Sequence, residues 1–135
     1  MTTATTDTRE DLLRRRSEQR AFLEDQNRLE RAKLKPAGER LKMYKVEAEK
    51  QRRRVATLTP WGQQGDVEAS SALRTAREKF AAAVDECENV ERSIREINRR
   101  SGEFEAALHA LDAAKVDGGS RGDLEKVLAA MREER

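Results

Sequence analysis

The chain has 135 residues, enough for one domain, and its formal net charge at pH 7 is only +2. Charged residues make up 40% of it and aromatic residues 4%, a composition too poor in large apolar groups for a thick globular core. Abundant Ala, Glu, Lys, Arg and Leu favour long helices in shallow contact, so we predict an all-α protein with a coiled coil. No apolar run is long enough to cross a membrane, and the single cysteine excludes an internal disulfide framework, so we expect an intracellular, cytoplasmic protein.

The first predicted helix covers residues 8–58. Residues 1–7 before it have neither a basic leader nor a hydrophobic stretch, so we expect a disordered tail there rather than a secretory signal. Asp7 or Thr8 is the expected N-cap. From residue 34 onward, apolar and small residues recur at alternating steps of four and three, which is the spacing of a coiled-coil stripe. These positions are Leu34, Ala37, Leu41, Tyr44, Ala48, Gln51, Val55 and Leu58.

Upstream of residue 34 the stripe is about one position out of step, at Leu12, Phe22 and Leu29. The slip falls at Pro36, which removes a backbone donor and crowds the preceding turn. Because no polar loop accompanies this proline, we expect one helix that is bent there, with two separate helices as the alternative.

Residues 59–66, TPWGQQGD, differ from the charged tracts on both sides and are predicted to form a loop. A residue before proline avoids the helical region, so Pro60 should end the first helix. The two glycines of this segment suit a turn, and Asp66 is placed to cap the next helix.

A second helix, over residues 67–116, carries the most regular pattern in the chain. Its stripe keeps the four-three alternation over six heptads, and only Ser101 within it is polar. Gly102 is unfavourable in a helix, but the residues after it keep the phase set upstream, so we expect the helix to continue. The stripe consists of Ala69, Leu73, Ala76, Phe80, Ala83, Cys87, Val90, Ile94, Ile97, Ser101, Phe104, Leu108 and Leu111.

Two helices of similar length around a short loop predict a long antiparallel coiled-coil hairpin in which the stripes face each other. In that register Leu13 lies near Leu111, and Asn27 faces Ile97. Residues 1–58 contain 16 Lys and Arg against 10 Asp and Glu, whereas residues 59–135 contain 12 against 16. The two arms therefore also attract each other electrostatically.

Residues 117–120 are predicted to be a flexible joint before a short amphipathic helix over residues 121–135. A helix of this length is not stable alone in water, so its apolar face must pack on another surface. That surface is either the open end of the hairpin, near Leu12, Leu13 and Phe22, or another chain. The apolar face consists of Leu124, Val127, Leu128 and Met131.

The sequence offers little for catalysis or metal binding. His109 is the only histidine and lies off the stripe, where an exposed side chain is expected. Cys87 lies on the stripe opposite Ala37 and is expected to be a buried thiol, with a disulfide between two chains as the alternative. Because the chain has no phosphate-binding glycine loop and too few Cys and His for zinc, we expect no enzyme activity, cofactor, metal or small-molecule substrate.

The tip of the predicted hairpin is the main candidate for partner binding. Tryptophan dominates many protein interfaces, so Trp61 is assigned to a partner contact together with Gln63 and Gln64. The alternative is that Trp61 folds over the last helical turn against Leu58 and Val67. The apolar face of the C-terminal helix is the second candidate contact surface.

Arg52, Arg53 and Arg54 form a basic cluster near the tip, where phosphate contact is the minor alternative. Three consecutive helical residues point in different directions, and no aromatic residue is interleaved for base stacking. We therefore expect these arginines to be solvated helix surface.

The sequence carries no motif that assigns it to a family. We predict a non-enzymatic coiled-coil adaptor or structural subunit that joins proteins within a larger complex. Apolar residues away from the stripes, such as Met43 and Val46, favour association with other subunits or with a second copy. The alternatives are a nucleic-acid-associated protein that uses the basic first arm and a holdase-type chaperone.

Overall fold

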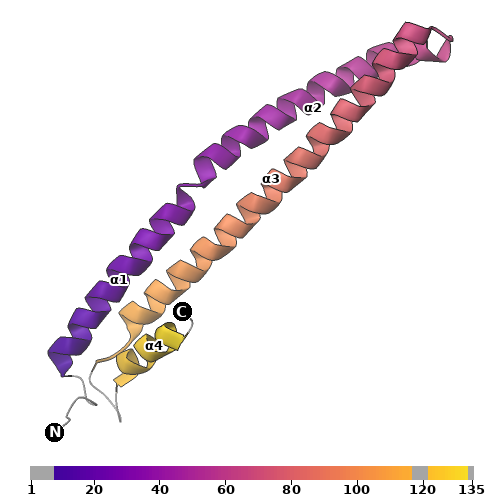
Figure 1. Cartoon of the computed structure of the whole chain (residues 1–135). Helices are drawn as coiled ribbons and strands as arrows, with labels where there is room; N and C mark the ends of the chain where they lie inside the picture. The colour runs from indigo at the N-terminus through magenta and orange to yellow at the C-terminus, as the bar shows by residue number, and fades with distance from the viewer. Residues whose placement is uncertain (1–7, 117–121, 134–135) are drawn as a thin grey trace. The chain divides into compact units, whose positions relative to one another are not determined.

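The computed structural model describes residues 8–116 and 122–133, and the regular structure in these residues is α-helical (Figure 1). The helices are α1 (Arg9–Arg31), α2 (Leu34–Gln63), α3 (Val67–Ala113) and α4 (Gly122–Glu133). The predicted all-α class is therefore confirmed. None of the described helices is both long enough and apolar enough for a membrane span. The predicted tail and joint, residues 1–7 and 117–120, lie outside the described residues.

The chain divides into two compact units. Unit 1 comprises Met1–Ala32 and Asn98–Arg135, and unit 2 comprises Lys33–Ile97. Unit 1 therefore contains α1, α4 and the end of α3, whereas unit 2 contains α2 and the start of α3.

In unit 1, α1 and the end of α3 run antiparallel, because their bonded partners follow opposite orders along the two helices. The Nε of Arg20 donates to Oδ1 of Asp112 at 2.9 Å. One to two turns later in α1, Oδ1 of Asn27 accepts from the hydroxyl of Ser101 at 2.7 Å, although Ser101 comes earlier in α3. Both bonds are polar, so this pairing does not rest on apolar contacts alone.

The core of unit 1 is apolar and includes α4. Leu111 and Leu124 have no exposed surface, and the amide of Leu124 donates to the carbonyl oxygen of Lys115 at 3.0 Å. Partly buried apolar side chains from α3 and α4 pack against this core. The end of unit 1 is thus covered by α4, which is one of the two packing alternatives that the sequence left open. The buried core residues are Leu12, Leu23, Leu111, Ala114, Leu124 and Leu128.

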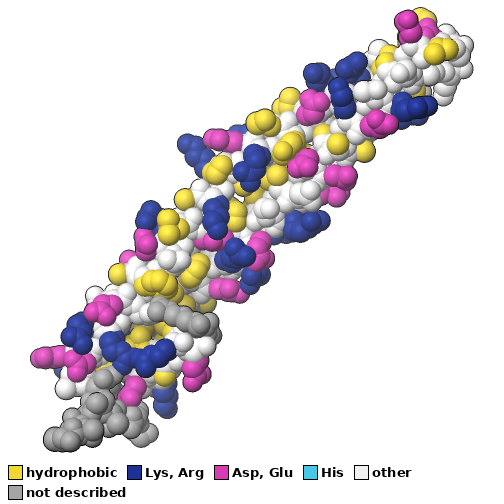
Figure 2. All heavy atoms as spheres, in the orientation of Figure 1, with side chains coloured by type: hydrophobic (Ala, Val, Ile, Leu, Met, Phe, Trp, Pro, Cys, Tyr) yellow, Lys and Arg dark blue, Asp and Glu magenta, His cyan; other side chains and the backbone are white. Residues whose placement is uncertain are grey.

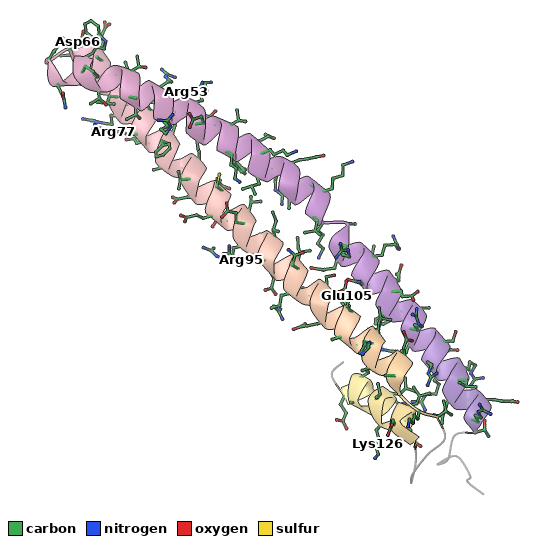
Figure 3. The ribbon with its side chains drawn as sticks, turned by 180° about the vertical axis from the view of Figure 1, so that it is seen from behind. Arg53, Asp66, Arg77, Arg95, Glu105 and Lys126 are labelled. Atoms are coloured by element: carbon green, nitrogen blue, oxygen red, sulfur yellow. The ribbon has the colours of Figure 1, made fainter. Side chains whose placement is uncertain are left out.

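In unit 2, α2 and the start of α3 lie side by side, joined by a turn at residues 64–66 (Figures 1 and 3). Gly65 adopts a φ of +84° in this turn, a left-handed conformation that favours glycine. Every residue of the predicted stripe of α2, from residue 34 to 58, is buried or half-buried, and so is every stripe residue of α3 from residue 69 to 97. The stripes predicted from heptad spacing are therefore the buried faces of these helices.

Both helix caps proposed from the sequence are present. The hydroxyl of Thr8 accepts from the amide of Asp11 at 3.1 Å, and the Asp11 side chain accepts from the amide of Thr8, which completes a capping box at the start of α1. Oδ1 of Asp66 accepts from the amide of Ala69 at 3.0 Å at the start of α3. Each cap satisfies amides that have no acceptor within the helix.

The predicted single helix over residues 8–58 is wrong, because a turn at residues 32–33 separates α1 from α2. Pro36 lies in the first turn of α2. The first amides of a helix have no intrahelical acceptor, so a missing N–H is tolerated there. The proline therefore begins a new helix instead of bending an existing one.

The predicted loop over residues 59–66 is also wrong, because α2 continues through Pro60 and ends at Gln63. Pro60 is exposed and lies one turn before the end of α2. Proline provides no N–H for the carbonyl group of Ala56, but Ala56 is exposed, so water can solvate that carbonyl group. The connection is consequently reduced to the turn at residues 64–66.

The register predicted for α1 differs from the observed one. Asn27 bonds Ser101, four residues beyond Ile97, which it was predicted to face. Leu13, predicted to lie near Leu111, is 40% exposed, and Leu12 occupies the core instead. The predicted register assumed a connection centred near residue 62, whereas the turn lies at residues 64–66.

Of the predicted apolar stripe of α1, Leu12 is buried, but its other two residues are displaced by one position. Phe22 and Leu29 are exposed, while the residues that follow them, Leu23 and Glu30, are buried. A charged residue at a buried position hides the stripe from a search for apolar residues, which explains the error.

The remaining helix assignments agree with the structure more closely. α3 continues through Gly102 as predicted, and it ends at Ala113 rather than at residue 116. α4 is confirmed as a helix, with bounds at Gly122–Glu133 within the predicted range of 121–135.

Candidate interaction site

The end of unit 2 nearest the turn carries the Trp61 side chain, which is 56% exposed. Because α2 continues through Pro60, Trp61 lies on the last turn of a helix rather than on a loop. Gln63 is the last residue of α2 and Gln64 is its C-cap, and both are exposed. Val67, at the start of α3, is 80% exposed, so this end presents two large apolar side chains to solvent.

A groove of about 420 Å³ lies between α2 and α3 at this end. Leu73 gives the groove an apolar side chain, and its own exposure is only 7%. Gly62 brings the helices close together, because a Cβ atom there would lie 3.0 Å from Cδ2 of Leu73. The hydroxyl of Ser70 also donates to the carbonyl oxygen of Gly62 at 3.4 Å. The residues lining the groove are Gly62, Gln63, Ser70, Leu73, Arg74, Arg77 and Glu78.

Arg74 and Arg77 give the groove two cations without an ion-pair partner among the described residues. Both side chains are exposed, and Figure 3 shows Arg77 on α3 not far from the turn marked by Asp66. Residues three apart on a helix lie on one face, one turn from each other. The groove therefore combines an apolar floor with two guanidinium groups on its α3 side.

The predicted basic cluster Arg52–Arg54 does not act as one patch. Glu49 binds Arg52 through two hydrogen bonds of 2.8 and 2.6 Å and binds Nε of Arg53 at 3.1 Å. The hydrogen bond from Arg52 is the main reason that the pKa of Glu49 is lowered to about 2, and the same bond raises the pKa of Arg52. Of the three arginines in this cluster, Arg54 alone is exposed and forms no ion pair with another described residue.

The residues predicted as a second contact surface, on α4, are directed inward. Leu124 and Leu128 are buried in the core of unit 1, and Val127 and Met131 are half-buried against it. Their apolar area is thus used within the chain. α4 belongs to unit 1, whereas Trp61 belongs to unit 2.

A second cavity, of about 310 Å³, lies between α1 and α4 in unit 1. Its lining mixes cations, an anion and two apolar side chains: Arg15, Glu18, Gln19, Phe22, Leu128 and Arg132. Arg15, Gln19 and Phe22 of this lining already interact with other groups of the chain, unlike the two arginines of the groove in unit 2.

The residues considered for chemistry stay apart from both cavities. His109 is exposed and Cys87 is half-buried on the stripe of α3. Within residues 8–116 and 122–133, no group of three or more His, Cys, Asp and Glu side chains could hold a metal ion.

Sequence reasoning missed Arg74, Arg77 and the groove that they flank. The sequence contained part of the information needed to predict this groove. Arg74 follows the stripe residue Leu73, and Arg77 lies three residues later on the same edge of the helix. The missing information was the extent of α2: with residues 59–66 expected as a loop, Gly62 could not be placed opposite Leu73.

Comparison with known proteins adds no relative. The chain matches no family model, and searches of curated proteins and of solved structures found no match to it.

Proposed function

We propose that the protein is a non-enzymatic helical adaptor or structural subunit, whose helices form an antiparallel coiled-coil hairpin and whose turn end contacts another protein. The observation that carries this proposal is the exposure of Trp61, 56%, on the last turn of α2. Large aromatic side chains next to arginines are over-represented among the residues that dominate protein interfaces.

Two further observations support the proposal. The heptad stripes of α2 and α3 are buried or half-buried throughout, as expected of helices that pack along their length. On α2, Met43 and Val46 are 68% and 70% exposed, so unit 2 has apolar surface outside its helix pair. A helix pair that exposes apolar side chains at its end and along one helix is suited to assembly with other proteins.

The test is affinity capture from cells that make the protein, with the intact chain and two variants. Trp61→Ala should lose the partner while keeping the helical circular dichroism spectrum. Leu29→Ala removes an exposed apolar side chain from α1, in unit 1, and should keep the partner. Identical captured proteins for the intact chain and the Trp61→Ala variant would contradict an interface at this end.

A further inference from the structure

We propose that the groove between α2 and α3 at the turn end of unit 2 binds an acidic helical segment of a protein partner, with a leucine-sized side chain in the groove and carboxylates on Arg74 and Arg77. This inference rests on the proposed function, because it specifies the chemistry of the partner for the same end of unit 2.

The charge of this end favours an acidic partner. Residues 49–80 contain seven Lys and Arg against four Asp and Glu, although the chain as a whole is nearly neutral. Figure 2 shows Lys and Arg side chains gathered along the part of α2 that approaches the turn. Glu49 already binds Arg52 and Arg53, so the excess positive charge falls on residues without an ion pair, including Arg54, Arg74 and Arg77.

The spacing of the cations favours a helix as the bound segment. Arg74 and Arg77 are one turn apart on the same edge of α3. Two carboxylates three or four residues apart on a partner helix have matching separation, and an arginine can bind a carboxylate through two parallel hydrogen bonds.

The shape of the groove favours an apolar residue between those carboxylates. Leu73 gives the groove an apolar side chain, and Gly62, which packs closely against Leu73, adds no side chain to the α2 wall. A cavity of about 420 Å³ accommodates a side chain of the size of leucine. Trp61 precedes Gly62 in α2 and supplies further apolar area at the same end.

A nucleic acid fits these features less well. Single-stranded nucleic acids are bound on several aromatic side chains, whereas Trp61 is the only aromatic residue between residues 45 and 79. The two readings are separated experimentally by using both kinds of probe.

The experiment measures binding of a fluorescein-labelled peptide made of Leu-Glu-Glu-Ala repeats to the intact chain, by fluorescence anisotropy. A peptide of Leu-Gln-Gln-Ala repeats is the uncharged control, and an oligothymidylate is the nucleic-acid probe. Emission of Trp61 reports the location of binding, because Trp61 is the only tryptophan in the chain. The expected result is that the acidic peptide binds and shifts the Trp61 emission, and that the other two probes bind at least about tenfold more weakly.

Matched double variants test the two arginines. Arg74→Gln with Arg77→Gln should weaken binding of the acidic peptide by about tenfold or more. Arg92→Gln with Arg95→Gln makes the same change in net charge, at the same spacing, on another part of α3 in unit 2, and should alter the dissociation constant less than about twofold. Equal losses in the two double variants, or tighter binding of the oligothymidylate than of the peptide, would overturn the inference.

The peptide-binding and capture experiments together show which of the two proposals fails. If Trp61→Ala abolishes capture but the acidic peptide does not bind, the end of unit 2 is an interface and the inference about an acidic partner is wrong. If Trp61→Ala leaves capture unchanged and the peptide does not bind, both proposals are wrong.

Discussion

Unit 1 and unit 2 are both built on paired helices, but they place their apolar side chains differently. Unit 1 has α4 as a third helix, and its core residues Leu111 and Leu124 have no exposed surface. Unit 2 has two helices and leaves Met43, Val46 and Trp61 more than half exposed. Two helices cannot bury all their apolar surface against each other, so the unit without a third helix keeps more of its apolar surface exposed.

The two units also differ in whether their charged side chains bond across helices or within one helix. In unit 1, Arg20 of α1 binds Asp112 of α3, and this bond lowers the pKa of Asp112. In unit 2, the hydrogen bonds of Glu49 stay within α2, and arginines of α3 beside the groove have no ion pair among the described residues. Bonds between helices thus join α1 to α3 in unit 1, whereas Arg74 and Arg77 of unit 2 form no ion pair with another described residue.

The largest expected effect tests the apolar core of unit 1. Leu111→Ala should lower the free energy of unfolding by about 2–5 kcal/mol, because it removes a fully buried side chain and leaves a cavity. Urea denaturation followed by circular dichroism measures the change. Leu29→Ala, at a site that is 48% exposed, is the control and should change stability by less than about 0.5 kcal/mol. Similar losses for both variants would remove the distinction between core and surface in unit 1.

The next effect tests how α4 is attached, by comparing Gly122 at its start with Gly102 in α3. Gly122 has a φ of +70°, and a Cβ atom there would lie 2.5 Å from the carbonyl oxygen of Val116. Gly122→Ala should therefore destabilise unit 1 by about 1–3 kcal/mol and speed hydrogen exchange of the α4 amides. At Gly102 no atom would lie within 4 Å of an added Cβ, so Gly102→Ala should stabilise α3 by about 0.5–1 kcal/mol. Changes of the same sign in the two variants would contradict this account of α4.

A smaller effect tests the polar residue in the buried face of unit 2. Gln51 is 2% exposed, its Nε2 donates to Glu47 at 2.9 Å, and its Oε1 accepts no hydrogen bond from the described residues. Gln51→Leu should raise the free energy of unfolding by about 1 kcal/mol, because it removes a buried acceptor without a donor. Thermal unfolding measures the gain, and Gln63→Leu, at an exposed position of the same helix, should give none. A loss of stability in Gln51→Leu would mean that the polar side chain supports the helix pairing.

The smallest effect concerns the ion pairs on the surface of α2. The pKa of Glu49 is lowered to about 2 by its bonds to Arg52 and Arg53, so its contribution to stability is present above its ordinary value of 4.5 and is lost as pH falls towards 2. Arg52→Ala should raise the pKa of Glu49 towards 4.5, as measured by NMR titration of the side-chain carboxyl. Arg54→Ala, which removes a neighbouring cation with no ion pair to Glu49, should leave that pKa nearly unchanged. Equal shifts in both variants would indicate general charge screening instead of specific bonds.

The sequence predicted the buried faces of α2 and α3 because their apolar residues keep one period over many turns. It failed in α1, where Glu30 occupies a buried position and Leu29 an exposed one, so hydrophobic periodicity points to the wrong side. It also failed at Pro60, because the local preference of proline to end a helix is outweighed in the structure near a helix terminus. These two errors displaced the predicted register of α1.

The candidate site was predicted in part. Trp61 was selected from its residue type and its place near the connection, and the structure shows it exposed on the last turn of α2. The groove could not be predicted, because it depends on Gly62 lying on a helix opposite Leu73. The α4 residues were selected for their apolar pattern, which cannot distinguish a face packed within the chain from one packed on a partner.

The exposed turn at residues 32–33 and the unbroken α3 should tolerate changes in chain length very differently. Residues added at the turn can loop out into solvent and leave the contact faces of α1 and α2 as they are. One residue added within α3 near residue 105, inside unit 1, would rotate the later side chains of α3 by about 100° relative to the earlier ones and turn Leu111 away from the core of unit 1. We therefore expect insertions in natural variants of this chain at the turn and not within α3.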